Sequence, residues 1–153
     1  MEGTAEHIMG LVEVIDTHWS WADLTAVRIE ALNPFGNLIV EDREGRFWRI
    51  CPEELSAEII AASRDDLIAL RRSPEFDADW SMSKLVTAAA AELGAPGPDV
   101  VFHLVIPAVL GGAYEVGNIR LIALEQLVAV SGDLGRQIHD LPNGAQVKLV
   151  IDK

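Results

Sequence analysis

Short apolar runs separated by turn residues fill the chain between residues 27 and 61, and they limit the folds that this segment can adopt. The predicted strands are residues 27–31, 38–42 and 47–51, with 57–61 as a possible fourth. Asn33-Pro34-Phe35-Gly36 and Arg43-Glu44-Gly45 supply turn chemistry between them. Connections this short cannot hold crossover helices, so the sequence predicts an antiparallel meander.

Helical patterns lie on both sides of this meander. The predicted helices are residues 8–15, 63–72, 82–93 and 124–134, and further strands are predicted at 100–106, 118–123 and 147–151. Ser63 with Asp66 is a capping signal, whereas Gly132 and Gly135 weaken the last helix. The run 100–106 is continuously apolar, as in a strand buried on both faces. We therefore predict the α+β class: an antiparallel meander sheet packed with helices, in a single domain over residues 1–153.

The chain is acidic, and its acidity is uneven. The formal net charge is −12; residues 1–80 hold 17 Asp and Glu against 7 Lys and Arg, whereas residues 81–153 hold 7 against 5. Phosphate groups are repelled by such a surface, which argues against nucleic-acid binding, whereas a basic protein would be attracted. The alternative is that the charge serves solubility alone.

Sequence motifs for catalysis are missing. The four histidines share no metal-ligand spacing, and neither H-E-x-x-H nor G-x-S-x-G occurs. Gly112 and Gly117 have the spacing of a phosphate-binding loop, but Asn118 and Ile119 stand where that loop needs Lys and Ser or Thr. A turn between strands explains these glycines better, and we expect no metal, no cofactor and no catalytic residue.

Cys51 and His103 are the two side chains that could still carry chemistry. Cys51 is the single cysteine, so an internal disulfide and a cysteine metal cluster are excluded. We interpret it as a small buried apolar side chain at a strand end and His103 as a satisfied core histidine, with a nucleophile and a general base as the alternatives. Of the tryptophans, Trp19, Trp21 and Trp80 are expected in the core, and Trp48 could be core or interface.

Several motifs together resemble one bacterial family. Trp19-Ser20-Trp21, the Asn33–Asn37 turn and the Gly turn before Trp48 are followed by Pro107-Ala108-Val109-Leu110-Gly111-Gly112. Over residues 18–135 the sequence resembles the C-terminal domain of type VI secretion immunity proteins, which often follows a GAD-like domain. The resemblance implies a protein that binds and neutralises an antibacterial effector, often a DNase. The motif residues expected to be structural are Phe35, Gly36, Asn37, Pro107, Leu110, Gly111 and Gly112.

Two of these residues carry a backbone expectation. At least one of Gly111 and Gly112 should have a positive φ or pack against neighbouring backbone, where a Cβ would clash. Because the motif consists of glycine, proline and apolar residues, it indicates the fold and does not locate an interface.

Turn carboxylates in the acidic half are the candidates for partner binding. Turn positions should free their side chains from structural roles, and an effector nuclease would offer a basic channel. The candidate residues are Asp42, Glu44, Trp48, Glu53, Glu54, Glu75, Asp77 and Asp79. The alternative is that the acids only solubilise the chain and an apolar patch near Trp48 binds.

The sequence therefore favours a cytoplasmic immunity protein of a toxin–antitoxin pair used in interbacterial competition. Its start lacks the basic and apolar segments of a signal peptide, and its most apolar stretch, 100–113, is too short to cross a bilayer. Its partner would be a protein, and neither nucleic acid nor membrane. A housekeeping ligand-binding or scaffold domain, and an enzyme with a cleft near Gly111-Gly112, are the alternatives.

Overall fold

The computed structural model describes residues 5–141, with side chains from residue 10, and its centre is a four-stranded antiparallel sheet. The strands are β1 (Ala26–Leu32), β2 (Leu38–Asp42), β3 (Phe47–Cys51) and β4 (Ser56–Ala61), in the order β1-β2-β3-β4. The predicted meander, including its fourth strand, and the α+β class are confirmed. Register shifts in the β1–β2 and β3–β4 pairs interrupt the ladders, as β-bulges do.

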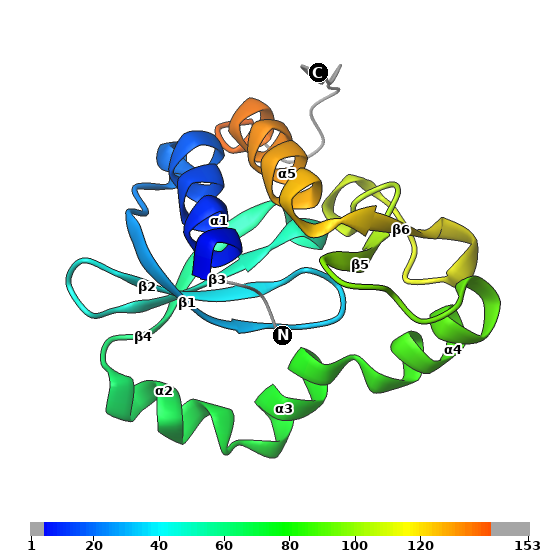
Figure 1. The fold of residues 1–153 in the computed structure, drawn as a ribbon, viewed down its shortest axis with the longest axis horizontal. Coiled ribbons are helices and arrows are strands. Elements are labelled where there is room, and N and C mark those ends of the chain that lie inside the picture. The colour runs from blue at the N-terminus through cyan, green and yellow to red at the C-terminus, as the bar shows by residue number, and fades with distance from the viewer. Residues whose placement is uncertain (1–4, 142–153) are drawn as a thin grey trace.

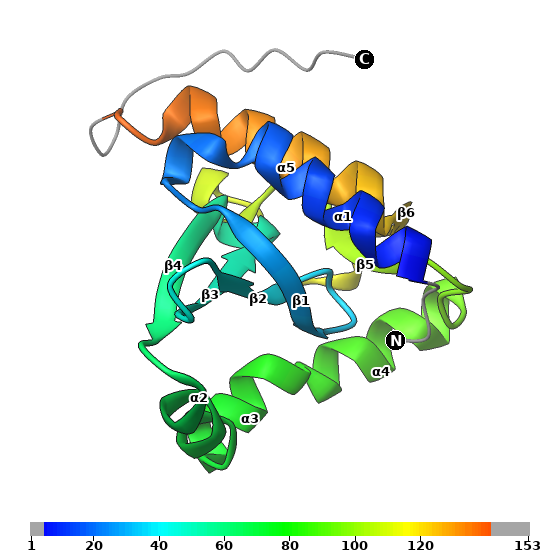
Figure 2. The ribbon, with the colours of Figure 1, turned by 60° about the vertical axis from the view of Figure 1, so that its left-hand side comes forward.

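Two helices cover one face of the sheet. In Figures 1 and 2, α1 (Ala5–His18) and α5 (Leu124–Ile138) lie side by side across it, although they come from opposite ends of the described chain. Leu11 and Ile15 are fully buried, as their helical spacing predicts. They pack with Val40 of β2 and Val128 of α5 in the largest apolar core.

Glycines 132 and 135 of α5 are packing positions. A Cβ on Gly132 would lie 2.5 Å from the carbonyl oxygen of His18, and one on Gly135 would lie 2.6 Å from the Trp21 ring. The Trp19 indole donates to the Val128 carbonyl at 2.9 Å. The two glycines thus let the tryptophan motif approach the helix, and the expectation that they weaken it misread their role.

Three helices run along the other side of the sheet in Figure 2. They are α2 (Arg64–Arg71), α3 (Pro74–Ser81) and α4 (Ser83–Leu93). The predicted cap of α2 is confirmed, because the Ser63 side chain accepts the N–H of Asp66. Helix α3 was not predicted: Pro74 looks like a helix stop, but it occupies the first turn of a new helix, which Ser73 caps by accepting the N–H of Phe76.

A second, two-stranded sheet pairs β5 (Val100–Leu104) with β6 (Ile119–Ala123). Phe102 and Ile119 are fully buried and pack against α4 and Phe35. The prediction that the whole run 100–106 is buried on both faces is wrong. Val105 and Ile106 follow the end of β5 and are each 53% exposed, because the chain turns there into the glycine-containing loop. The strand predicted at 147–151 lies outside the described residues.

Candidate functional site

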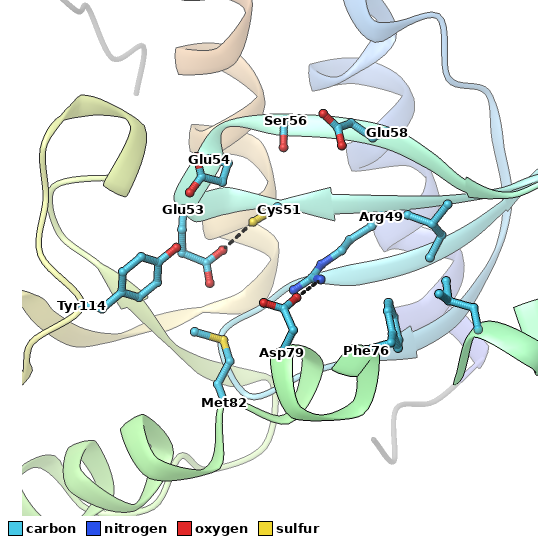
Figure 3. Close-up of a pocket in the computed structure, with 12 residues that line it drawn as sticks. Arg49, Cys51, Glu53, Glu54, Ser56, Glu58, Phe76, Asp79, Met82 and Tyr114 are labelled. Carbon is cyan, nitrogen blue, oxygen red and sulfur yellow. Dashed lines mark hydrogen bonds and ion pairs between the residues drawn. The ribbon is translucent and has the colours of Figure 1, made fainter. Parts of the chain in front are cut away.

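An open cavity of about 490 Å³ lies on the face of β3 and β4 that is turned away from α1 and α5 (Figure 3). Side chains alternate along a strand, so residues 49 and 51 of β3 share this face with residues 56, 58 and 60 of β4. Helix α2, α3, the 3₁₀ turn Pro52–Glu54 and Tyr114 supply the remaining walls.

The cavity is negatively charged. Four carboxylates line it, those of Glu53, Glu54, Glu58 and Asp79, against the one guanidinium of Arg49. Asp79 pairs with Arg49. Among the side chains that the structure describes, Glu53, Glu54 and Glu58 form no ion pair.

Glu53 is the most buried of these acids, at 3% exposure. The Asn37 amide donates to both of its carboxylate oxygens, at 3.0 and 2.9 Å, and the Cys51 thiol donates to one of them at 3.1 Å. The carboxylate is the acceptor in each of these bonds. The expectation that Glu53 is free of structural duty is therefore wrong, because a turn residue can still point inward.

Cys51 is a hydrogen-bond donor in this cavity. Burial raises the pKa of its thiol far above the ordinary value, and the negative charge of Glu53 raises it further. A nucleophilic cysteine needs the opposite setting, near a cation or a helix N-terminus. Cys51 ends β3 as expected, but it is only partly buried and its thiol bonds to a carboxylate, so the expectation of a buried apolar side chain holds in part.

Arg49 connects the sheet to α3. Its Nε donates to the Asn37 side-chain oxygen at 3.0 Å, and its guanidinium pairs with Asp79 and lies 5.2 Å from the centre of the Trp80 ring. Asn37 is fully buried, and because its side chain accepts from Arg49 and donates to Glu53, it links these two residues. The structural role predicted for Asn37 has a physical basis here: it orders the cavity floor.

Tyr114 was missed by sequence reasoning, which treated its loop as structural. It is 46% exposed, and burial of the hydroxyl raises its pKa, with further contributions from Glu53 and its acidic neighbours. The signal in the sequence that could have pointed to Tyr114 was its position two residues after the glycine motif.

The loop that carries Tyr114 is held by backbone packing. Gly111 has φ +97°, and a Cβ on Gly112 would meet the Ile106 carbonyl oxygen at 1.7 Å. The Asn118 side chain accepts the N–H of Ile106 and donates to the Ile106 and Ala113 carbonyls. The expectation for the two glycines is therefore confirmed. Pro107 and Leu110 lie at the two ends of the 3₁₀ turn that precedes Gly111.

Asp42 lies at the opposite end of β3, in the β2–β3 turn. It is 3% exposed and accepts the backbone N–H groups of Glu44 and Arg46, the Trp48 indole and the Arg46 guanidinium. Burial raises its pKa, but these hydrogen bonds outweigh that effect, and its pKa lies below the usual value. Asp42 is a structural residue, which corrects the expectation that its side chain is free.

The remaining candidates divide between the surface and the core. Glu44 is exposed and pairs with Arg46, and Glu75 accepts the Ser73 hydroxyl near the start of α3. Asp77 is exposed and does not line the cavity. Trp48 is 7% exposed and packs in the main core, so the apolar alternative near it lacks an exposed ring. The structure therefore gathers Glu53, Glu54 and Asp79, and places the other candidates elsewhere.

The tryptophans and the turn before β2 also lie where packing needs them. Trp19 is fully buried, whereas Trp21 and Trp80 are half-buried, so the core expectation holds fully for Trp19 and in part for the other two. Phe35 is fully buried, and Gly36 has φ +73° and packs against Leu127. His103 is half-buried, and burial lowers its pKa.

The described residues 5–141 form five α-helices. None of their helices is long and apolar enough to cross a membrane. Within residues 5–141 no group of three or more His, Cys, Asp or Glu side chains is placed to hold a metal ion.

The cavity thus combines an acidic lining with apolar side chains on one face of β3 and β4. Residues 61–135 match the family model described as T6SS immunity protein Tdi1, C-terminal, which confirms over this part of the chain the resemblance to type VI secretion immunity proteins. The match includes α2–α4, the glycine loop, Tyr114 and most of α5, and it begins after the first three strands and Glu53.

Among solved structures, the crystal structure of Atu4351 from Agrobacterium tumefaciens has the same fold, with a TM-score of 0.53 and 16% sequence identity. The similarity covers 85% of this chain and 64% of that one, so this chain spans less than two thirds of the length of that protein. No curated protein matches the sequence.

Proposed function

We propose that this protein is an immunity protein that binds a cognate type VI secretion effector and neutralises it by occluding its active site. The observation that carries the proposal is the family match over residues 61–135. The acidic cavity supports a protein partner of opposite charge, and an effector nuclease is such a partner because its nucleic-acid channel must be basic.

The cavity supports binding over catalysis. Its possible nucleophile, Cys51, has a raised pKa, and its buried acid, Glu53, already accepts three hydrogen bonds. His103, the possible general base, is not among the residues that line this cavity. An enzyme would need a group poised to give or take a proton there, and the surroundings of Cys51 and Glu53 do not favour that role for either of them.

Cys51 offers a direct test of that argument. We predict that a thiol-alkylating reagent modifies native Cys51 at neutral pH several times more slowly than a cysteine in an unfolded peptide, because little thiolate forms. Mass spectrometry of the intact protein over time measures the rate. Faster alkylation than that of the peptide would reinstate the nucleophile and with it the enzyme alternative.

The proposal places the protein in the cytoplasm, where a nuclease effector would find its substrate. The experiment is a competition assay in the source bacterium. Deleting the gene should make recipient cells sensitive to sibling cells with an active type VI secretion system, and a plasmid copy should restore survival. Attackers that lack the secretion system are the matched control.

Two results would overturn the proposal. Equal survival of deleted and intact recipients would favour a housekeeping binding or scaffold role. Sensitivity that persists when the plasmid copy is expressed would show that another gene gives protection.

A further inference from the structure

We propose that the acidic cavity binds one basic side chain, a lysine or arginine of the partner protein, and that Glu53 forms an ion pair with it. The inference rests on the proposed function for the identity of the partner. It rests on the cavity itself for the chemistry of the occupant.

The central observation is a buried acid that pairs with none of the cations among the described residues. Glu53 is 3% exposed, lines the cavity, and accepts bonds only from the neutral Asn37 amide and Cys51 thiol among the described side chains. Removing a carboxylate from water is costly unless a positive charge compensates it. The arginine in the same cavity does not do so, because its guanidinium is paired with Asp79 and its Nε bonds to Asn37.

The walls select an amphipathic cation. Ile60, Leu70, Phe76 and Met82 form apolar lining, and the carboxylates of Glu54 and Glu58 add charge. A lysine or arginine carries an aliphatic stem and a charged head. The stem can contact the apolar lining residues while the head pairs with the carboxylates. A volume of about 490 Å³ is enough for one such side chain with water.

Tyr114 lines the same cavity and supplies a second means of recognition. Its ring is 46% exposed and lies next to Glu53 in Figure 3. A cation above an aromatic face gains electrostatic energy, so a guanidinium that approaches Glu53 can also contact this ring. The contact of the Arg49 guanidinium with the Trp80 ring, at 5.2 Å from its centre, is an example of the same interaction within the chain.

The test fills the cavity from within. Ser56 lies on β4 directly opposite Cys51 and lines the cavity, so Ser56→Arg places a tethered guanidinium where the partner's would enter. Ser56→Gln is the matched control, since it adds a polar stem without the charge. We expect Ser56→Arg to raise the melting temperature of the full chain relative to Ser56→Gln, because it supplies the missing cation.

The ligand assay uses N-acetyl-arginine amide as the probe and its neutral citrulline counterpart as the control. At millimolar concentrations the arginine compound should shift the ring resonances of Tyr114 in the wild-type protein, and the citrulline compound should not. Ser56→Arg should abolish that shift, whereas Ser56→Gln should retain it. Glu92→Gln, which removes an exposed acid of α4 outside the cavity, should bind like wild type.

The competition assay then separates the two proposals. If wild type protects recipients and Ser56→Arg protects much less than Ser56→Gln, both proposals stand. If Ser56→Arg folds and protects like Ser56→Gln, or the two probes act alike, the proposed binding of a basic side chain is wrong and immunity is unaffected. If the arginine probe binds selectively but wild type never protects, the binding of a basic side chain stands and the proposed function fails.

Discussion

Asp42 and Glu53 are two equally buried acids at opposite ends of β3, each 3% exposed, and they differ in what surrounds them. Asp42 accepts two backbone N–H groups, an indole N–H and a guanidinium, all from residues within six positions of it. Glu53 accepts an amide and a thiol, and none of the described cations pairs with it.

The difference teaches that burial alone does not separate a structural acid from a binding acid. At the Asp42 end the chain provides every partner, including the opposite charge, and no part of the site remains to be filled. At the Glu53 end the chain orients the carboxylate and leaves a cavity beside it, and none of the described residues supplies a cation. Mutations at the first end should therefore change stability, and mutations at the second should change binding.

The largest effect should come from Asp42→Asn. Its new amide would face the N–H donors of Trp48 and Arg46, which leaves the buried Trp48 indole unpaired and breaks the ion pair with Arg46. We expect a loss of about 3 kcal/mol in the free energy of unfolding, measured by urea denaturation. Glu44→Gln in the same turn is the control, since that side chain is exposed. A loss no larger than that of the control would end the distinction between the two acids.

The same variant should also change the pH dependence of stability. The pKa of Asp42 is lowered in the folded state, so its contribution is present above its unfolded pKa, about 3.9, and is lost as pH falls through the folded value. The stability difference between wild type and Asp42→Asn should therefore shrink below about pH 4. A constant difference from pH 7 to pH 2 would contradict this assignment.

Gly112→Ala should have the next largest effect, because it strains the loop that carries Tyr114 to the Glu53 end. The added methyl would meet the Ile106 carbonyl oxygen at 1.7 Å, and the exposed loop can relieve only part of that clash. We expect a loss of about 2 kcal/mol in stability, with weaker partner binding. Gly117→Ala in the same loop has no atom within 4 Å of its Cβ and should be nearly neutral.

These two sites also show how far the sequence could be interpreted. The meander, the Ser63 cap of α2 and the conformations of Gly111 and Gly112 depend on neighbouring residues, and local patterns predicted them correctly. Helix α3 was missed because Pro74 fits both a stop and a first turn, and only the Ser73 cap distinguishes them. The burial of Glu53 depends on Asn37, sixteen positions away, and no local pattern encodes that contact.

Glu53→Gln should cost much less stability than Asp42→Asn. The substitution disturbs the bonds from Asn37 and Cys51, but it also removes a buried charge that no described cation compensates. These effects oppose each other, so we expect a change within about 1 kcal/mol in the free energy of unfolding. Calorimetry of both variants at pH 7 gives the comparison. A loss equal to that of Asp42→Asn would make Glu53 a structural acid of the same kind.

The smallest expected effect concerns association rate and compares two exposed acids. Glu54 borders the cavity, and Glu44 lies in the turn at the other end of β3. Changing either one to glutamine should alter the free energy of unfolding by no more than about 0.5 kcal/mol. If a basic side chain enters the cavity, Glu54→Gln should slow effector association about twofold at low salt, and the difference should fade as salt screens the charges. Glu44→Gln should have less effect, because its charge is already offset by Arg46.

Stopped-flow association at two salt concentrations measures the association rates of both variants. Equal slowing by the two variants would mean that the whole acidic surface attracts the partner, whereas slowing by Glu44→Gln alone would move the binding surface to the Asp42 end.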